Sequence, residues 1–164
     1  MHASWAWKLP VFFGLLLVGA FFSGAEASLF SLGKYRLQRL HRFSARKFSI
    51  LEKLLESPTR LIGTLLVGNE IANTALEVIG ASIIYDYFSV RLGGEANPLL
   101  PLLTVAILLP IVIIFSELIP KAYGLKNAEK VAVRAAYPLW FFHRWVAPVR
   151  ATIHWLPDRM MKLM

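Results

Sequence analysis

The chain has 164 residues, of which 57% are hydrophobic, with no cysteine and a formal net charge of +8. The absence of cysteine excludes disulfides and thiolate metal sites. Uninterrupted apolar runs such as LTVAILLPIVIIF are too long for the core helices of a small soluble domain. The composition therefore predicts an all-α membrane protein.

The first apolar segment runs from about residue 10 to residue 32, and a helix needs roughly 20 apolar residues to cross a bilayer. No small-residue cleavage site with soluble sequence follows it, so we expect a retained helix and not a signal peptide. Among its polar residues are Ser23, Glu26 and Ser28. In a regular helix the two serines would point roughly 140° apart. Gly24 between them predicts a local unwinding or a wide turn, which would add backbone carbonyls to the hydroxyls.

The connector that follows is basic and predicts a cytoplasmic surface helix at residues 34–56, because its apolar residues recur at helical spacing. This connector contains eight Lys or Arg, the next contains only Arg91, and the chain after the third apolar segment contains eight more. By the positive-inside rule the amino terminus lies outside and the carboxyl terminus lies in the cytoplasm. Since the charge flanks apolar segments, we expect membrane lipid, and no nucleic acid, as its partner.

The second apolar segment runs from about residue 61 to residue 85. The Ser57-Pro58 pair marks its start, because the missing N–H of proline costs nothing at the first helical position. Among its polar residues are Asn69, Glu70, Asn73 and Glu77. The two asparagines are one turn apart and share a face. Glu70 lies roughly 100° around the helix from Asn69, so we expect Glu70 to line a water-filled path or bind a coupling cation.

The third apolar segment runs from about residue 99 to residue 120 and contains Ser116 and Glu117. Pro120 cannot donate to the carbonyl of Ser116, so a regular helix would leave a free carbonyl oxygen beside Glu117. Pro110 likewise cannot donate a hydrogen bond to the carbonyl four residues before it. Because its surroundings are apolar, we expect only a kink there.

The remaining chain mixes aromatic and basic residues over residues 127–164. Pro138, Pro148 and Pro157 are expected to divide it into short amphipathic helices at the lipid interface. We therefore divide the chain into a three-span transmembrane domain, residues 1–126, and a cytoplasmic juxtamembrane region, residues 127–164.

The polar residues inside the spans are expensive, because an ionised side chain at mid-membrane costs about 2.5–3.5 kcal/mol. Each has a structural interpretation, a hydrogen bond to a neighbouring helix, with Glu26 paired to an arginine and Glu77 close to outer water. Together they supply hard oxygen ligands, which suit Mg²⁺, Ca²⁺ or Na⁺ better than zinc or copper. The sequence therefore predicts a cation site inside a helical bundle.

Three stretches carry a family resemblance: FFSGAEASLFSLGKYRLQRL, LLVGNEIANTALEVIGASI and IFSELIPKAYGLKNAEKVA. They resemble the signature segments of the transmembrane domain of the CorC/cyclin-M (CNNM) magnesium transporters. The resemblance implies a homodimer in a bacterial inner membrane, with three membrane helices and one bound Mg²⁺ per protomer. Carried over position by position, the metal site falls on Ser23, Ser28, Asn69 and Glu117, with Gly24 and Asn73 adjoining.

The function that we expect is Mg²⁺ export from the cytosol, with Na⁺ as the coupling ion that the resemblance implies. The alternative is a membrane sensor or scaffold that binds Mg²⁺ and regulates another transporter. We do not expect an enzyme, because the spans contain no nucleophile–base pair and all four histidines lie outside them. Family members continue into cytosolic CBS domains, whereas this sequence ends at Met164, so we expect an isolated membrane domain.

Overall fold

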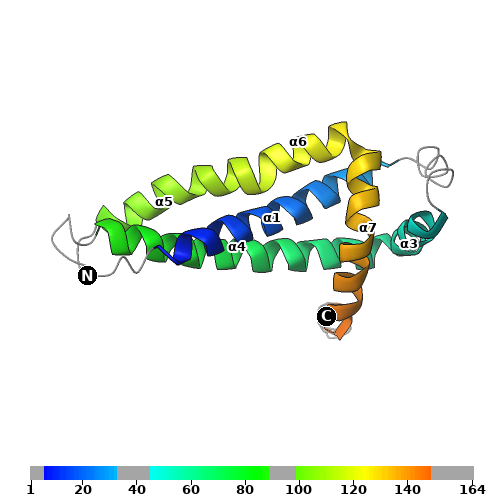
Figure 1. Cartoon of the computed structure of the whole chain (residues 1–164), viewed down its shortest axis with the longest axis horizontal. Coiled ribbons are helices and arrows are strands. Elements are labelled where there is room, and N and C mark those ends of the chain that lie inside the picture. The colour runs from blue at the N-terminus through cyan, green and yellow to red at the C-terminus, as the bar shows by residue number, and fades with distance from the viewer. Residues whose placement is uncertain (1–5, 33–44, 89–98, 149–164) are drawn as a thin grey trace, which may run out of the picture.

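The computed structural model describes residues 6–32, 45–88 and 99–148, and within these ranges every element is a helix. The elements are α1 (Lys8–Ser31), α3 (Ala45–Leu55), α4 (Pro58–Phe88), α5 (Leu99–Ile111), η1 (Val112–Leu118), α6 (Ile119–Lys126) and α7 (Ala128–Trp145). Figure 1 shows α1, α4 and the continuous rod α5–η1–α6 lying side by side along the long axis. The helices α3 and α7 lie together at one end of this bundle, which we call the α7 end.

The three apolar segments are helical as predicted, with shifts of a few residues at their ends. The second segment begins at Pro58, and the carbonyl of Ser57 accepts a 3.1 Å hydrogen bond from the amide of Leu61. Proline therefore occupies the first helical position, where it costs no hydrogen bond. The predicted basic helix is observed as α3, while its first part, residues 34–44, lies outside the described residues.

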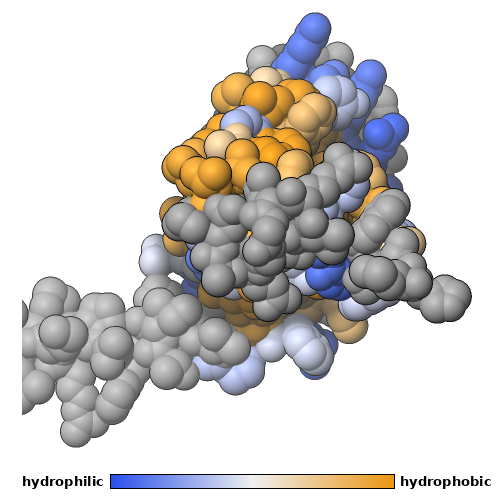
Figure 2. Space-filling model, turned by 90° about the vertical axis from the view of Figure 1, so that its left-hand side faces the viewer, coloured by the Kyte–Doolittle hydropathy of each residue, from blue (hydrophilic) through white to orange (hydrophobic). Residues whose placement is uncertain are grey.

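Membrane-spanning length and composition are clearest for two helices, Lys8–Ser31 and the rod Leu99–Lys126. The third, α4, has 31 residues, or roughly 46 Å of helix, but it carries more charged residues, and its span remains a prediction. The rod exposes large apolar side chains, among them Leu102, Val105, Leu109 and Leu118. In Figure 2 the upper part, where Figure 1 draws the rod, is accordingly largely hydrophobic.

The last described helix, α7, runs across the end of the bundle (Figure 1). Its inner face buries Ala132, Ala136 and Leu139 in a cluster with residues of α1, α3 and α4, while Trp140 and Trp145 on its outer face are exposed. The prediction that Pro138 divides this region was wrong, because α7 runs through Pro138. We attribute this to the buried residues on both sides of Pro138, whose packing offsets the one lost backbone hydrogen bond.

Candidate metal centre

Five polar side chains meet in the middle of the bundle, and we call them the polar cluster: Ser23 of α1, Asn69 and Asn73 of α4, and Ser116 and Glu117 of η1. Both serines are fully buried, whereas the asparagines and Glu117 are half-buried. Four of the five were singled out as metal-site residues from the sequence. Segments more than 40 residues apart in the chain therefore contribute to one site.

Hydrogen bonds connect the cluster in two parts. The hydroxyl of Ser23 donates to Oδ1 of Asn69 at 3.2 Å. Asn73 receives a hydrogen bond on Oδ1 from the hydroxyl of Ser116 at 3.0 Å, and its Nδ2 donates to Oε1 of Glu117 at 3.0 Å. Because the two asparagines are four residues apart, the two parts lie roughly one helical turn apart along α4.

Close approach of α1 brings these groups together. At Gly19, one turn before Ser23, a Cβ atom would collide with the hydroxyl of Ser116 and lie 3.2 Å from Oδ1 of Asn73. A Cβ at Gly68 of α4 would collide with the ring of Phe22. Small residues at such positions let membrane helices pack closely. The two glycines therefore set how near α1 comes to the polar cluster.

The helix that carries Ser116 and Glu117 is a π-helix, and not the regular α-helix from whose spacing the free carbonyl of Ser116 was predicted. The amide of Ile119 donates to the carbonyl of Ile114, five residues back, and Pro120 follows without an N–H. The wider turn lets two consecutive side chains, Ser116 and Glu117, contact the same Asn73. π-Helical turns often occur at functional sites.

Gly24 and Ser28 take other positions than the sequence suggested. The helix α1 is continuous through both residues, so the predicted unwinding at Gly24 was wrong. Gly24 faces α6, where a Cβ atom would lie 3.3 Å from the carbonyl oxygen of Pro120. The buried hydroxyl of Ser28 donates to the carbonyl of Ala25 at 2.9 Å and makes no described hydrogen bond with the polar cluster.

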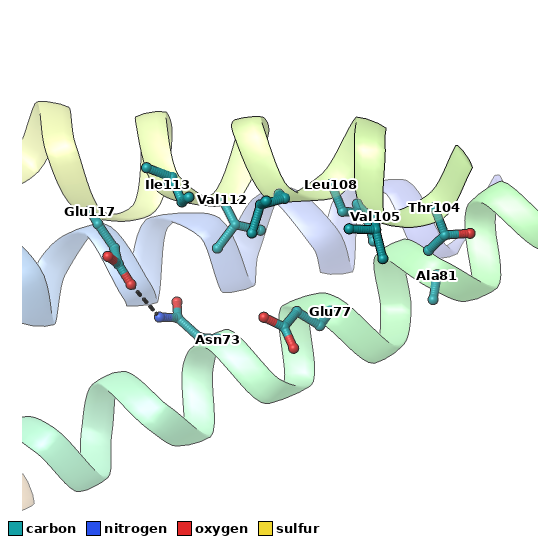
Figure 3. Close-up of a pocket in the computed structure, with 10 residues that line it drawn as sticks. Asn73, Glu77, Ala81, Thr104, Val105, Leu108, Val112, Ile113 and Glu117 are labelled. Carbon is teal, nitrogen blue, oxygen red and sulfur yellow. Dashed lines mark hydrogen bonds between the residues drawn. The ribbon is translucent and has the colours of Figure 1, made fainter. Parts of the chain in front are cut away.

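The polar cluster opens into a cavity of about 430 Å³ between α4 and the rod. Asn73, Glu77 and Glu117 lie along this cavity, and Val105, Leu108, Val112 and Ile113 contribute apolar walls. Figure 3 shows Glu117 directed at Asn73, with Glu77 farther along α4 in the same groove. The cavity therefore connects the cluster with a second carboxylate.

The other two acids predicted at membrane depth lie elsewhere. Glu26 pairs with Lys121, with 3.4 Å between Oε2 and Nζ, and not with the arginine that we expected. Glu70 is exposed, and the hydroxyl of Thr74 donates to its Oε1 at 3.5 Å. Glu70 therefore makes no described hydrogen bond with the polar cluster. This agrees with its predicted position on another side of α4.

The donor set consists of neutral oxygens with one carboxylate. Among the described residues no three His, Cys, Asp or Glu side chains come together. Such a set favours a hard cation, since hydroxyl, amide and carboxylate oxygens are ligands of Mg²⁺ and Ca²⁺. The hydroxyl of Ser116 was not among the predicted ligands, because the sequence pattern around Pro120 indicates only the carbonyl of that residue.

Comparison with known proteins agrees with this architecture. The cyclin M transmembrane N-terminal domain family matches residues 10–164. Similar proteins include the UPF0053 inner membrane protein YfjD of Escherichia coli, 28% identical over 90% of this chain and 32% of the relative, and a UPF0053 protein of Haemophilus influenzae, 35% identical over 76% of this chain and 28% of the relative. The chain thus spans about a third or less of the length of these relatives. It belongs to the cyclin M transmembrane N-terminal domain family.

Proposed function

We propose that this membrane domain transports Mg²⁺ through the polar cluster. The observation that carries the proposal is the contact of Asn73 with both Ser116 and Glu117 inside a bundle of apolar helices. One carboxylate and several neutral oxygens at membrane depth need partners, and a cation that exchanges with water supplies them transiently. The family to which the chain belongs supports a role related to membrane transport.

The distances between oxygens are compatible with Mg²⁺. Adjacent oxygens in an octahedral shell are about 3 Å apart, because each lies about 2.0–2.1 Å from the ion. The oxygens of Ser23 and Asn69 are 3.2 Å apart, and those of Ser116 and Asn73 are 3.0 Å apart. Each pair can therefore exchange its hydrogen bond for a shared cation with little movement, and water completes the shell.

The cavity beside the polar cluster forms one half of the route by which we propose that the ion crosses the membrane. Glu77 lies in this cavity with Asn73 and Glu117, and it has no described hydrogen-bond or ion-pair partner. We assign Glu77 to the water-filled route by which the ion leaves or reaches the cluster. In the orientation that the basic residues predict, this end of the bundle is external and the α7 end is cytoplasmic.

The assembled transporter that we propose is a homodimer in a bacterial inner membrane that exports Mg²⁺ with Na⁺ as the coupling ion. Exposed apolar residues, among them Leu66, Ile71 and Val78, lie on α4 before and after the exposed Glu70. A second protomer at this face would remove Glu70 from lipid. This arrangement gives Glu70 a role at the subunit contact and not in the metal shell.

Flux through the purified domain in liposomes tests the proposal. Vesicles that contain a Mg²⁺-sensitive dye and the protein should show Mg²⁺ movement well above that of protein-free vesicles, and Glu117→Gln should abolish the difference. A domain that binds Mg²⁺ in titration calorimetry but moves none under any Na⁺ gradient would instead be a sensor or scaffold. Movement through Glu117→Gln at the rate of the unmodified protein would exclude the polar cluster as the route.

A further inference from the structure

Two residues of the signature segments, Glu26 and Lys121, are not used by the polar cluster. Lys121 Nζ lies 3.4 Å from Glu26 Oε2, so the two side chains form an ion pair between α1 and α6. The glutamate side chain is 31% exposed and the lysine side chain is 42% exposed. Ion pairs with this much exposure are weak and easily exchanged.

The ion pair lies beside the polar cluster on the same two helical segments. Glu26 follows Ser23 by three residues on α1, and Lys121 follows Glu117 by four residues on the rod. Both segments run toward the α7 end in Figure 1. The ion pair is therefore displaced by roughly one helical turn, about 5 Å, from the cluster toward that end.

A cavity opens at the ion pair. It has a volume of about 360 Å³ and is lined by Glu26, Ala27, Phe30, Ser31, Lys121 and Leu125. Six water molecules occupy about 180 Å³, at about 30 Å³ each. A hydrated divalent cation with its six waters can therefore enter this cavity and contact Glu26.

The helices themselves are held close at this level. A Cβ atom at Gly124 of α6 would collide with the carbonyl oxygen of Gly24 of α1, and a Cβ at Gly24 would lie 3.3 Å from the carbonyl oxygen of Pro120. Backbones packed this closely leave little freedom for α1 and α6 to shift against each other. Any control of access at this level therefore falls to side chains and not to movement of these helices.

We propose that Lys121 is a tethered counter-cation that occupies Glu26 until a hydrated divalent cation displaces it. The proposal rests on Mg²⁺ transport through the polar cluster. A divalent ion is attracted to the carboxylate more strongly than the lysine ammonium is, because its charge is doubled. Glu26 then receives the ion from the α7 end and passes it to Glu117, while the long side chain of Lys121 moves into the open part of the cavity.

A double-mutant cycle measured by Mg²⁺ titration calorimetry tests this inference. Lys121→Met should raise the apparent Mg²⁺ affinity by about threefold or more, because the competing charge is gone. Glu26→Gln should lower the affinity, and the double variant should match Glu26→Gln, since Lys121 acts only through Glu26. Lys126→Met, which removes an exposed lysine from the same helix, should bind as the unmodified protein does.

Three results would contradict the displacement of Lys121 by a divalent cation, and each has a different meaning. If Lys121→Met and Glu26→Gln lower the melting temperature equally and leave Mg²⁺ affinity unchanged, the ion pair is a structural brace. If the unmodified protein binds Mg²⁺ through Glu117 but the cycle gives no coupling, the inference fails and the proposed function stands. If the unmodified protein binds no Mg²⁺, both fail.

A second measurement avoids charge variants that fold poorly. The chain contains no cysteine, so Ser31→Cys places a single thiol in the wall of this cavity. Mg²⁺ should slow the labelling of this thiol by a water-soluble maleimide, because the hydrated ion fills the cavity. A labelling rate that is unchanged at saturating Mg²⁺ would contradict the inference.

Discussion

Asn73 connects more of the polar cluster than any other described side chain, because its oxygen contacts Ser116 and its nitrogen contacts Glu117. Asn69 contacts only Ser23 in the described structure. A hydrogen bond to a charged group contributes about 1.5–3 kcal/mol, which is roughly a tenfold to hundredfold change in an equilibrium constant. Loss of Asn73 therefore removes the orientation of the one carboxylate in the site.

We predict that Asn73→Ala weakens Mg²⁺ binding by about tenfold or more and that Asn69→Ala weakens it less. Titration calorimetry of both variants in the same detergent provides the measurement. Circular dichroism serves as the control for helix content. A larger loss in Asn69→Ala would place the ion at the Ser23 part of the cluster and not at Glu117.

The two glutamates of α4 differ in position and should differ in effect. Glu77 lines the cavity with Asn73 and Glu117, whereas Glu70 is exposed beside Thr74. We predict that Glu77→Gln keeps Mg²⁺ binding but slows flux in liposomes, because the path loses its carboxylate. Glu70→Gln should bind Mg²⁺ normally, so slow flux in Glu70→Gln with normal flux in Glu77→Gln would reverse the assignment.

At the scale of elements, the packing of α1 against α4 and η1 determines whether the cluster has room for an ion. We predict that Gly19→Ala abolishes Mg²⁺ binding, because the added Cβ would occupy the position of the Ser116 hydroxyl. Gly14→Ala is the matched control on the same helix, since no atom lies within 4 Å of its Cβ position. Normal Mg²⁺ titration in Gly19→Ala would show that α1 does not limit the site.

Sequence patterns predicted the helices well but not their local form. The apolar lengths and the Ser57-Pro58 pair located α1, α4 and the rod, and the spacing of Asn69 and Asn73 predicted their shared face. The π-helix at η1 could not be predicted, because Pro120 indicates a broken hydrogen bond without specifying a five-residue register. At Gly24 the sequence predicted an irregularity that α1 does not contain. A glycine that permits unwinding equally permits close helix packing.

Tertiary packing determines which of the other candidate residues lie beside the polar cluster. Ser28 and Ser23 are both buried, but only Ser23 faces a partner on α4, while Ser28 satisfies its hydroxyl within its own turn. The same packing selected Lys121 as the partner of Glu26. Sequence spacing fixes which residues share one helix face, but it does not specify which face meets which neighbour.

At the scale of the whole molecule, a cluster assembled from three closely packed helical segments should discriminate by ion size. Mg²⁺ takes about six oxygens at 2.0–2.1 Å, whereas Ca²⁺ takes six to eight at 2.3–2.6 Å. We predict that Mg²⁺ raises the melting temperature more than Ca²⁺ at equal concentration, and that Glu117→Gln removes the difference. Stronger protection by Ca²⁺ would indicate a wider cage than the described oxygens form.

The central claim is that one carboxylate at the centre of the bundle binds Mg²⁺. Titration calorimetry of Glu117→Gln against Glu70→Gln tests it most directly, because each variant removes one charge at membrane depth and keeps the shape of the side chain. We expect Glu117→Gln to give no Mg²⁺ binding heat and Glu70→Gln to bind as the unmodified protein does. Binding that persists in Glu117→Gln but is lost in Glu70→Gln would contradict the claim.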